Sequence, residues 1–138
     1  MLKKTKKNNR TGFEWCSRAL VNAPLHIALC TSETGYRREL KRLGQSNPPD
    51  WLPENSEGCV HEYAEALIVC VKPKKNREEA ISALVHESVH VWQFIRDYIG
   101  ERSPSVEFEA YSVETIFSTL REAYDAQVGT KRKQRKSA

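Results

Sequence analysis

The sequence lacks several features that would mark a membrane or secreted protein. Its 138 residues contain no hydrophobic run near the roughly 18 residues that a membrane-spanning helix needs. The basic N-terminus is not followed by the apolar core of a signal peptide. No Cys-x-x-Cys pair occurs among the four cysteines, Cys16, Cys30, Cys59 and Cys70. These absences predict a cytoplasmic protein with reduced thiols and no membrane partner.

Acidic residues are absent from both ends of the chain. Residues 1–10 and 130–138 each hold five lysines or arginines and no acid. Residues 11–129 hold 12 basic and 18 acidic residues, a net charge of −6 within a total of +4. We therefore expect a single domain at 11–129 between two disordered basic tails. Polybasic tails bind phosphate backbones without sequence preference, so nucleic acid is a candidate partner.

Hydrophobic patterning and turn residues predict an α+β fold with a short sheet of about three strands packed on two long helices. Asn76 and Gly100 are the expected ends of the first long helix, and Pro104 is the expected first residue of the second. The continuously apolar stretch 67–71 is typical of a strand covered on both faces. The expected helices are 14–21, 32–43, 77–99 and 104–126, and the expected strands are 25–30, 59–63 and 66–71.

A His-Glu-x-x-His pattern lies in the middle of the predicted 77–99 helix. Residues four apart share a helical face, so His86 and His90 can bind one metal ion, with Zn–N distances of about 2.0–2.1 Å. Glu87 can then accept a proton from the attacking water. The alternative is a pair of surface histidines on an amphipathic helix. We expect the pair to lie opposite an apolar stripe formed by Ile81, Leu84, Val85, Val89, Trp92 and Ile95.

A catalytic zinc site needs a third protein ligand, and no histidine follows His90. A downstream ligand must then be a carboxylate, and Glu107 and Glu109 are the candidates. Glu109 shares a helical face with apolar residues such as Val106 and Ile116, whereas Glu107 lies on a polar face. We therefore predict Glu109 as the third ligand, with Glu107 as the alternative. The other interpretation is that both acids are solvated residues favoured by the helix dipole.

The segment His-Glu-Ser-Val-His at 86–90, followed by Glu109-Ala110, resembles the gluzincin type of zinc metallopeptidase. Residues 80–120 are also similar to short phage or prophage proteins described as metallopeptidases. The resemblance implies a small zincin-like domain that hydrolyses peptide bonds, with Zn²⁺ at His86, His90 and Glu109 and with Glu87 as the general base. Larger gluzincins often carry an acid four residues after the ligand glutamate, where this chain has Val113.

Further candidate groups concern the oxyanion and the substrate. Tyr111 is the working assignment for a catalytic group that stabilises the oxyanion, with Tyr98 and His61 as alternatives. The strand at 59–63, if it lies at a sheet edge, can bind a peptide or protein substrate by strand addition. The alternative function is a non-catalytic zinc module that binds nucleic acid or a protein partner. Glu87 favours the enzyme, because a structural zinc site needs no acid there. The sequence does not fix an oligomeric state.

Overall fold

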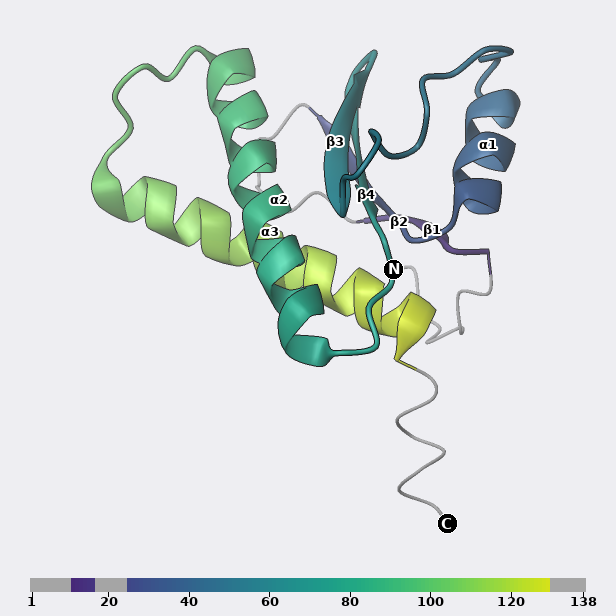
Figure 1. The fold of residues 1–138 in the computed structure, drawn as a ribbon. Coiled ribbons are helices and arrows are strands. Elements are labelled where there is room, and N and C mark those ends of the chain that lie inside the picture. Colours follow the sequence, from purple (N-terminus) through teal and green to yellow (C-terminus); the bar gives the residue numbers. More distant parts are fainter. Residues whose placement is uncertain (1–10, 17–24, 130–138) are drawn as a thin grey trace, which may run out of the picture.

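The computed structural model describes residues 11–16 and 25–129 (Figure 1). The predicted tails at 1–10 and 130–138 lie outside the described residues, as does most of the helix predicted at 14–21. The elements, in chain order, are β1 (Phe13–Trp15), β2 (His26–Cys30), α1 (Glu33–Arg42), β3 (Gly58–Tyr63), β4 (Ala66–Val71), α2 (Arg77–Ile99) and α3 (Val106–Val128).

Four strands form one mixed sheet in the order β1-β2-β4-β3. β2 and β4 are parallel, and the outer strands β1 and β3 are each antiparallel to their neighbour. The α+β class is confirmed, but the sheet has four strands within the described residues rather than about three. The difference is β1, where the helix predicted to begin at residue 14 is wrong. Phe13 and Trp15 pair instead with Cys30 and Ala28, and Phe13 is buried.

The sheet separates two hydrophobic cores, because successive side chains of a strand point to opposite faces. Helix α1 covers one face, and α2 and α3 cover the other (Figure 1). From β4, Leu67, Val69 and Val71 pack toward α2 and α3, whereas Ile68 and Cys70 pack toward α1. Every residue of β4 is buried, which confirms the prediction of a strand covered on both faces.

Side-chain caps set the ends of the long helices. The Asn76 side chain accepts a hydrogen bond from the Glu78 amide at 2.8 Å, and Gly100 ends α2 in the left-handed conformation with φ 74°, as predicted. Helix α3 begins later than predicted. Its cap is Ser105, whose hydroxyl accepts from the Phe108 amide at 3.2 Å. None of the helices in the described segments has the length and hydrophobicity of a membrane span.

Helix α2 turns a different stripe toward the core from the one predicted. Val85 and Val89 are 44% and 38% exposed, so their assignment to the stripe is wrong. Glu87 and Ser88 are buried instead. They lie between Leu84 and Val91 along the helix, and both of those residues belong to the core. Burial of Ser88 is tolerated because its hydroxyl donates to the Leu84 carbonyl at 2.6 Å. This rotation of α2 carries Glu87 toward the sheet.

Candidate metal centre

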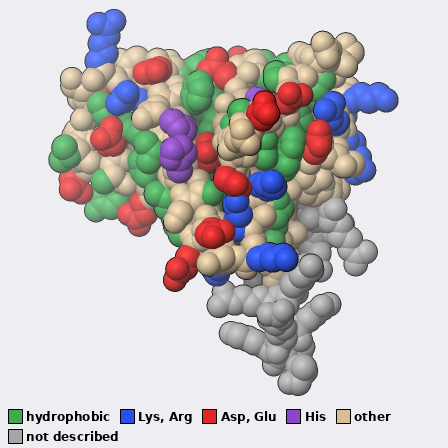
Figure 2. Space-filling view, in the orientation of Figure 1, with side chains coloured by type: hydrophobic (Ala, Val, Ile, Leu, Met, Phe, Trp, Pro, Cys, Tyr) green, Lys and Arg blue, Asp and Glu red, His purple; other side chains and the backbone are tan. Residues whose placement is uncertain are grey.

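His86 and His90 lie together on the exposed side of α2. Their Nε2 atoms are 3.2 Å apart. Figure 2 shows histidine side chains gathered on the surface over α2, with hydrophobic and acidic side chains around them. Two imidazole nitrogens bound tetrahedrally to one zinc ion are about 3.3 Å apart, given Zn–N distances near 2.05 Å. The pair therefore has the separation that a shared metal ion requires.

Gln93 orients the second histidine of the pair. Its Oε1 lies 2.9 Å from His90 Nδ1. Because an amide oxygen only accepts, the proton of His90 lies on Nδ1, and Nε2 keeps a lone pair toward His86. No role was predicted for Gln93 from the sequence. It follows His90 by three residues, and side chains three apart on a helix can contact each other. The orienting residue thus comes from α2 itself and not from the position of Val113 on α3.

Glu87 is buried beside the histidine pair. Glu87 is only 4% exposed, and its Oε2 has no hydrogen-bond partner among the described residues. Burial raises the pKa of Glu87, and the charges of His86 and His90 act in the opposite direction. A buried carboxylate oxygen without a partner is costly in a folded protein. The arrangement therefore favours a further group at this position that would supply the missing contact.

Gly58, the first residue of β3, makes room for this carboxylate. A Cβ atom at Gly58 would lie 3.0 Å from Glu87 Oε1 and 3.1 Å from the Cys70 carbonyl oxygen, closer than ordinary contact. A side chain at this position would require Glu87 or the Cys70 carbonyl to shift by a few tenths of an ångström, so the glycine leaves room for the buried carboxylate. In the sequence, Gly58 directly precedes the strand expected at 59–63, and no sequence pattern distinguishes it from other glycines in turns.

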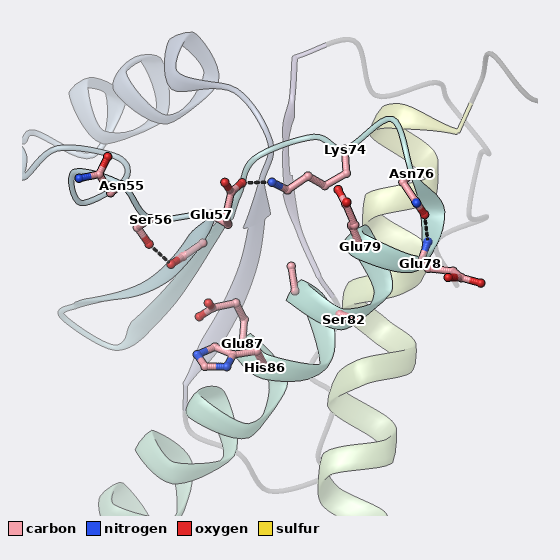
Figure 3. Close-up of a pocket in the computed structure, with 12 residues that line it drawn as sticks. Asn55, Ser56, Glu57, Lys74, Asn76, Glu78, Glu79, Ser82, His86 and Glu87 are labelled. Carbon is pink, nitrogen blue, oxygen red and sulfur yellow. Dashed lines mark hydrogen bonds and ion pairs between the residues drawn. The ribbon is translucent and has the colours of Figure 1, made fainter.

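A cleft of about 980 Å³ opens in front of His86 and Glu87. Its walls are the segment that leads into β3 and the first turns of α2 (Figure 3). An ion pair between Lys74 and Glu57 forms part of the wall. Figure 3 shows the His86 and Glu87 side chains next to each other, beside the start of β3. Strand β3 lies at the edge of the sheet, which is the position that strand addition requires.

Glu109, the predicted third ligand, faces α2 but contacts other partners. Its Oε2 accepts a hydrogen bond from Trp92 Nε1 at 2.9 Å and lies 3.9 Å from Arg96 Nη1. Within residues 11–16 and 25–129, no third His, Cys, Asp or Glu joins the histidine pair with all ligand atoms within 4.8 Å of one another. The structure brings together two of the three predicted ligands. Glu109 and the exposed Glu107 stay predictions.

The candidates for oxyanion stabilisation lie on three different elements, α3, α2 and β3. Tyr111 on α3 is 64% exposed and Tyr98 on α2 is 52% exposed. A role for either hydroxyl in stabilising the oxyanion stays a prediction. His61 lies on the α1 face of the sheet, where its ring stacks on Tyr36 with 5.3 Å between centroids.

Val106, predicted on the inward stripe of α3, is 79% exposed, because the buried part of that stripe begins further along the helix.

A second group of candidate ligands lies on the α1 face of the sheet. Cys59, His61 and Cys70 have ligand atoms within 4.8 Å of one another and can hold a metal ion. A hydrogen bond with Cys70 and the neighbouring His61 lower the pKa of Cys59 to about 5, and the Cys59 thiolate raises the pKa of His61. All four cysteines are free thiols. Cys70 lies within the continuously apolar stretch 67–71 and carries no local sign of a ligand, whereas the Cys-x-His spacing at 59–61 is a signal for this group.

A scan against protein-family models, a search of curated proteins and a search of solved structures each found no match for the chain. We therefore infer the function from the residues and their geometry.

Proposed function

We propose that the chain is a zinc-dependent metallopeptidase that hydrolyses peptide bonds in a peptide or protein substrate. One observation carries the proposal: the buried Glu87, whose Oε2 has no hydrogen-bond partner among the described residues, neighbours two histidines whose Nε2 atoms are 3.2 Å apart. A surface histidine pair alone would not explain why the acid between them is buried and unsatisfied.

The donor set suits zinc. Neutral imidazole nitrogens are preferred zinc ligands, and the hydrogen bond to Gln93 keeps His90 Nε2 available. His86 and His90 would hold the ion, with Glu109 as the proposed third ligand. When bound, zinc would polarise the substrate carbonyl and lower the pKa of a water molecule.

Glu87 has the properties of a general base at this position. Its burial raises its pKa, so the carboxylate holds a proton more strongly than a solvated glutamate does. It can accept a proton from the attacking water and deliver it to the leaving amine. The contact with Gly58 fixes its place between α2 and the edge strand.

Strand β3 supports a binding mode for the substrate. Within the described segments it is an edge strand that pairs with β4 alone, and its first residue lies over Glu87. An extended peptide added to this edge would run past the cleft and the histidine pair. Main-chain hydrogen bonds would then supply affinity without a demand for one sequence.

The test combines zinc analysis with a peptidase assay on a mixture of fluorogenic peptides. His86→Ala and His90→Ala should each remove one zinc ion per chain, and Glu87→Gln should keep the zinc and lose hydrolysis. Glu79→Gln, which changes an exposed acid of the same cleft, is the matched control and should behave as wild type. Hydrolysis by Glu87→Gln at the wild-type rate would refute the proposal.

The charge at the chain ends supports a second proposal, non-specific binding of nucleic acid. Residues 1–10 and 130–138 each carry five positive charges and no negative charge. Removal of 130–138 should lower affinity for DNA or RNA and flatten its salt dependence. Identical salt titrations with and without the segment would exclude it.

A further inference from the structure

We propose that Cys59, His61 and Cys70 form a second zinc site, on the opposite face of the sheet from the histidine pair, with Cys30 as the fourth ligand. This site does not depend on the peptidase proposal, because it shares no residue with it.

The pairing of three strands places the thiols in one row. Cys30 of β2 is the register partner of Cys70 in β4, and Cys70 is the register partner of Cys59 in β3. Neighbouring strands are about 4.8 Å apart, and side chains in register point to the same face. His61 follows Cys59 by two residues and so lies on that face as well. Four ligand side chains thus converge on the side covered by α1.

The distances between the ligand atoms are close to those of a zinc site. Cys59 Sγ lies 3.3 Å from His61 Nε2. A sulfur at 2.3 Å and a nitrogen at about 2.05 Å from a tetrahedral zinc ion are about 3.6 Å apart, and two sulfurs are about 3.8 Å apart. The ligand atoms of Cys59, His61 and Cys70 are all within 4.8 Å of one another, so shifts of about 1 Å or less would bring these three to zinc-binding distances. Cys30 is the register partner of Cys70 on the same face of the sheet, and its thiol donates to the Ser32 carbonyl at 3.0 Å. Its sulfur is not within 4.8 Å of all three other ligand atoms, so it would have to move further than they do to become the fourth ligand.

The surroundings are those of a structural site. Cys30 and Cys70 are fully buried, and Cys59 and His61 are half-buried. The carbonyl oxygen of Trp51 accepts hydrogen bonds from His61 Nε2 at 2.9 Å and from Cys59 Sγ at 3.2 Å, so the loop before β3 closes over the cluster. A bound metal ion would replace both hydrogen bonds, with loss of the two protons. Three cysteines and one histidine are a common ligand set of closed, four-coordinate zinc sites.

A disulfide is the competing explanation for close thiols. A disulfide needs only two cysteines and leaves no use for the histidine nitrogen 3.3 Å from Cys59. The third thiol, Cys30, would also stay unpaired. The zinc site accounts for all four side chains, and it would tie the edge strand β3 to β4 and β2.

Cobalt substitution distinguishes this site from the histidine pair. The full chain is purified under reducing, anaerobic conditions, stripped of metal and loaded with Co²⁺. Thiolate ligands give near-ultraviolet charge-transfer absorption, which a site of two histidines and a glutamate does not. We expect the band in wild type and in His86→Ala, and its loss in Cys59→Ser and His61→Gln. Cys30→Ala should lower its intensity by about one third, because two of three thiolates remain.

Cys16 provides the matched control, because its half-buried thiol packs against the core on the other face of the sheet. Cys16→Ser should keep the full band. Circular dichroism of each variant checks that the fold is retained, and the half-buried positions Cys59 and His61 are the least disruptive to change.

Three results would overturn the site: no charge-transfer band in wild type, a full band in Cys59→Ser, or a Cys59–Cys70 disulfide in the intact mass of the unreduced protein. An unchanged band in Cys30→Ala would remove Cys30 from the ligand set. Failure of the peptidase proposal would leave the band intact, since His86→Ala does not touch the thiols.

Discussion

Replacement of Glu87 by glutamine should stabilise the metal-free protein. Glu87 is 4% exposed and its Oε2 has no partner among the described residues. An unsatisfied buried polar group costs about 1–3 kcal/mol, and more when it is charged. Glutamine has nearly the same shape and no charge, so we expect Glu87→Gln to gain about 1–2 kcal/mol at pH 8. For a domain of this size that is a rise in Tm of about 4 °C per kcal/mol.

The gain should depend on pH with a defined sign. Burial raises the pKa of Glu87 above its value in the unfolded chain, so the folded state binds this proton more tightly. Glu87 therefore destabilises the folded wild type least below its pKa in the unfolded chain, about 4.3. The free energy of unfolding falls as pH rises from this value through the pKa of Glu87 in the folded state. Glutamine does not titrate. The advantage of Glu87→Gln should therefore shrink toward pH 4.

The assay is urea unfolding followed by circular dichroism, with chelator present, at several pH values between 4 and 8. Glu114→Gln, an exposed acid in the middle of α3, is the matched control and should change stability by less than about 0.5 kcal/mol. A Glu87→Gln protein that is less stable than wild type at pH 8, or a gain that grows toward pH 4, would refute the reasoning.

Three further changes test single contacts. Tyr36→Phe should cost about 1 kcal/mol in urea unfolding, because the buried hydroxyl donates to the Pro49 carbonyl at 2.9 Å, and an unchanged midpoint would contradict this. Gln93→Leu should weaken zinc binding about 10–100-fold in chelator competition by releasing His90 Nδ1, and unaltered affinity would exclude its orienting role. Gly58→Val should keep the zinc but lower kcat/KM about tenfold or more by displacing the buried carboxylate, and wild-type activity would show that this packing does not matter.

The sequence predicted those elements whose signals are local. Asn76 and Gly100 bound α2 at both ends, and the apolar stretch 67–71 identified β4. Strand β1 has only three residues and exists through its pairing with β2, so nothing in Phe13–Trp15 alone distinguishes it from the start of a helix. The start of α3 was misplaced because Pro104 and Ser105 are both typical of helix N-termini.

The candidate site was predictable only in part, for a similar reason. The i, i+4 spacing alone brings His86 and His90 together. The rotation of α2 about its axis is set by packing on the sheet, and Val85 and Val89 made a neighbouring stripe look equally apolar. In the thiol cluster, the Cys-x-His spacing joins Cys59 and His61, whereas the approach of Cys70 and Cys30 depends on strand register between distant segments. The position of Glu109 depends on the packing of α3 against α2.

Strand β3 connects the two proposed sites through alternation of its side chains. Gly58 lies over Glu87 on the α2 side of the sheet, and the next residue, Cys59, belongs to the thiol cluster on the α1 side. A slip of one residue in the pairing of β3 with β4 would exchange the two faces and place a side chain on the buried carboxylate.

As an edge strand, β3 is held by hydrogen bonds to one neighbour only. A metal ion that links Cys59 to Cys70 would fix that register where it is least restrained. It would thereby keep Gly58 opposite Glu87. In this interpretation the thiol site has no part in hydrolysis, yet it holds the strand that gives the general base its place and offers the edge to which a substrate peptide would add.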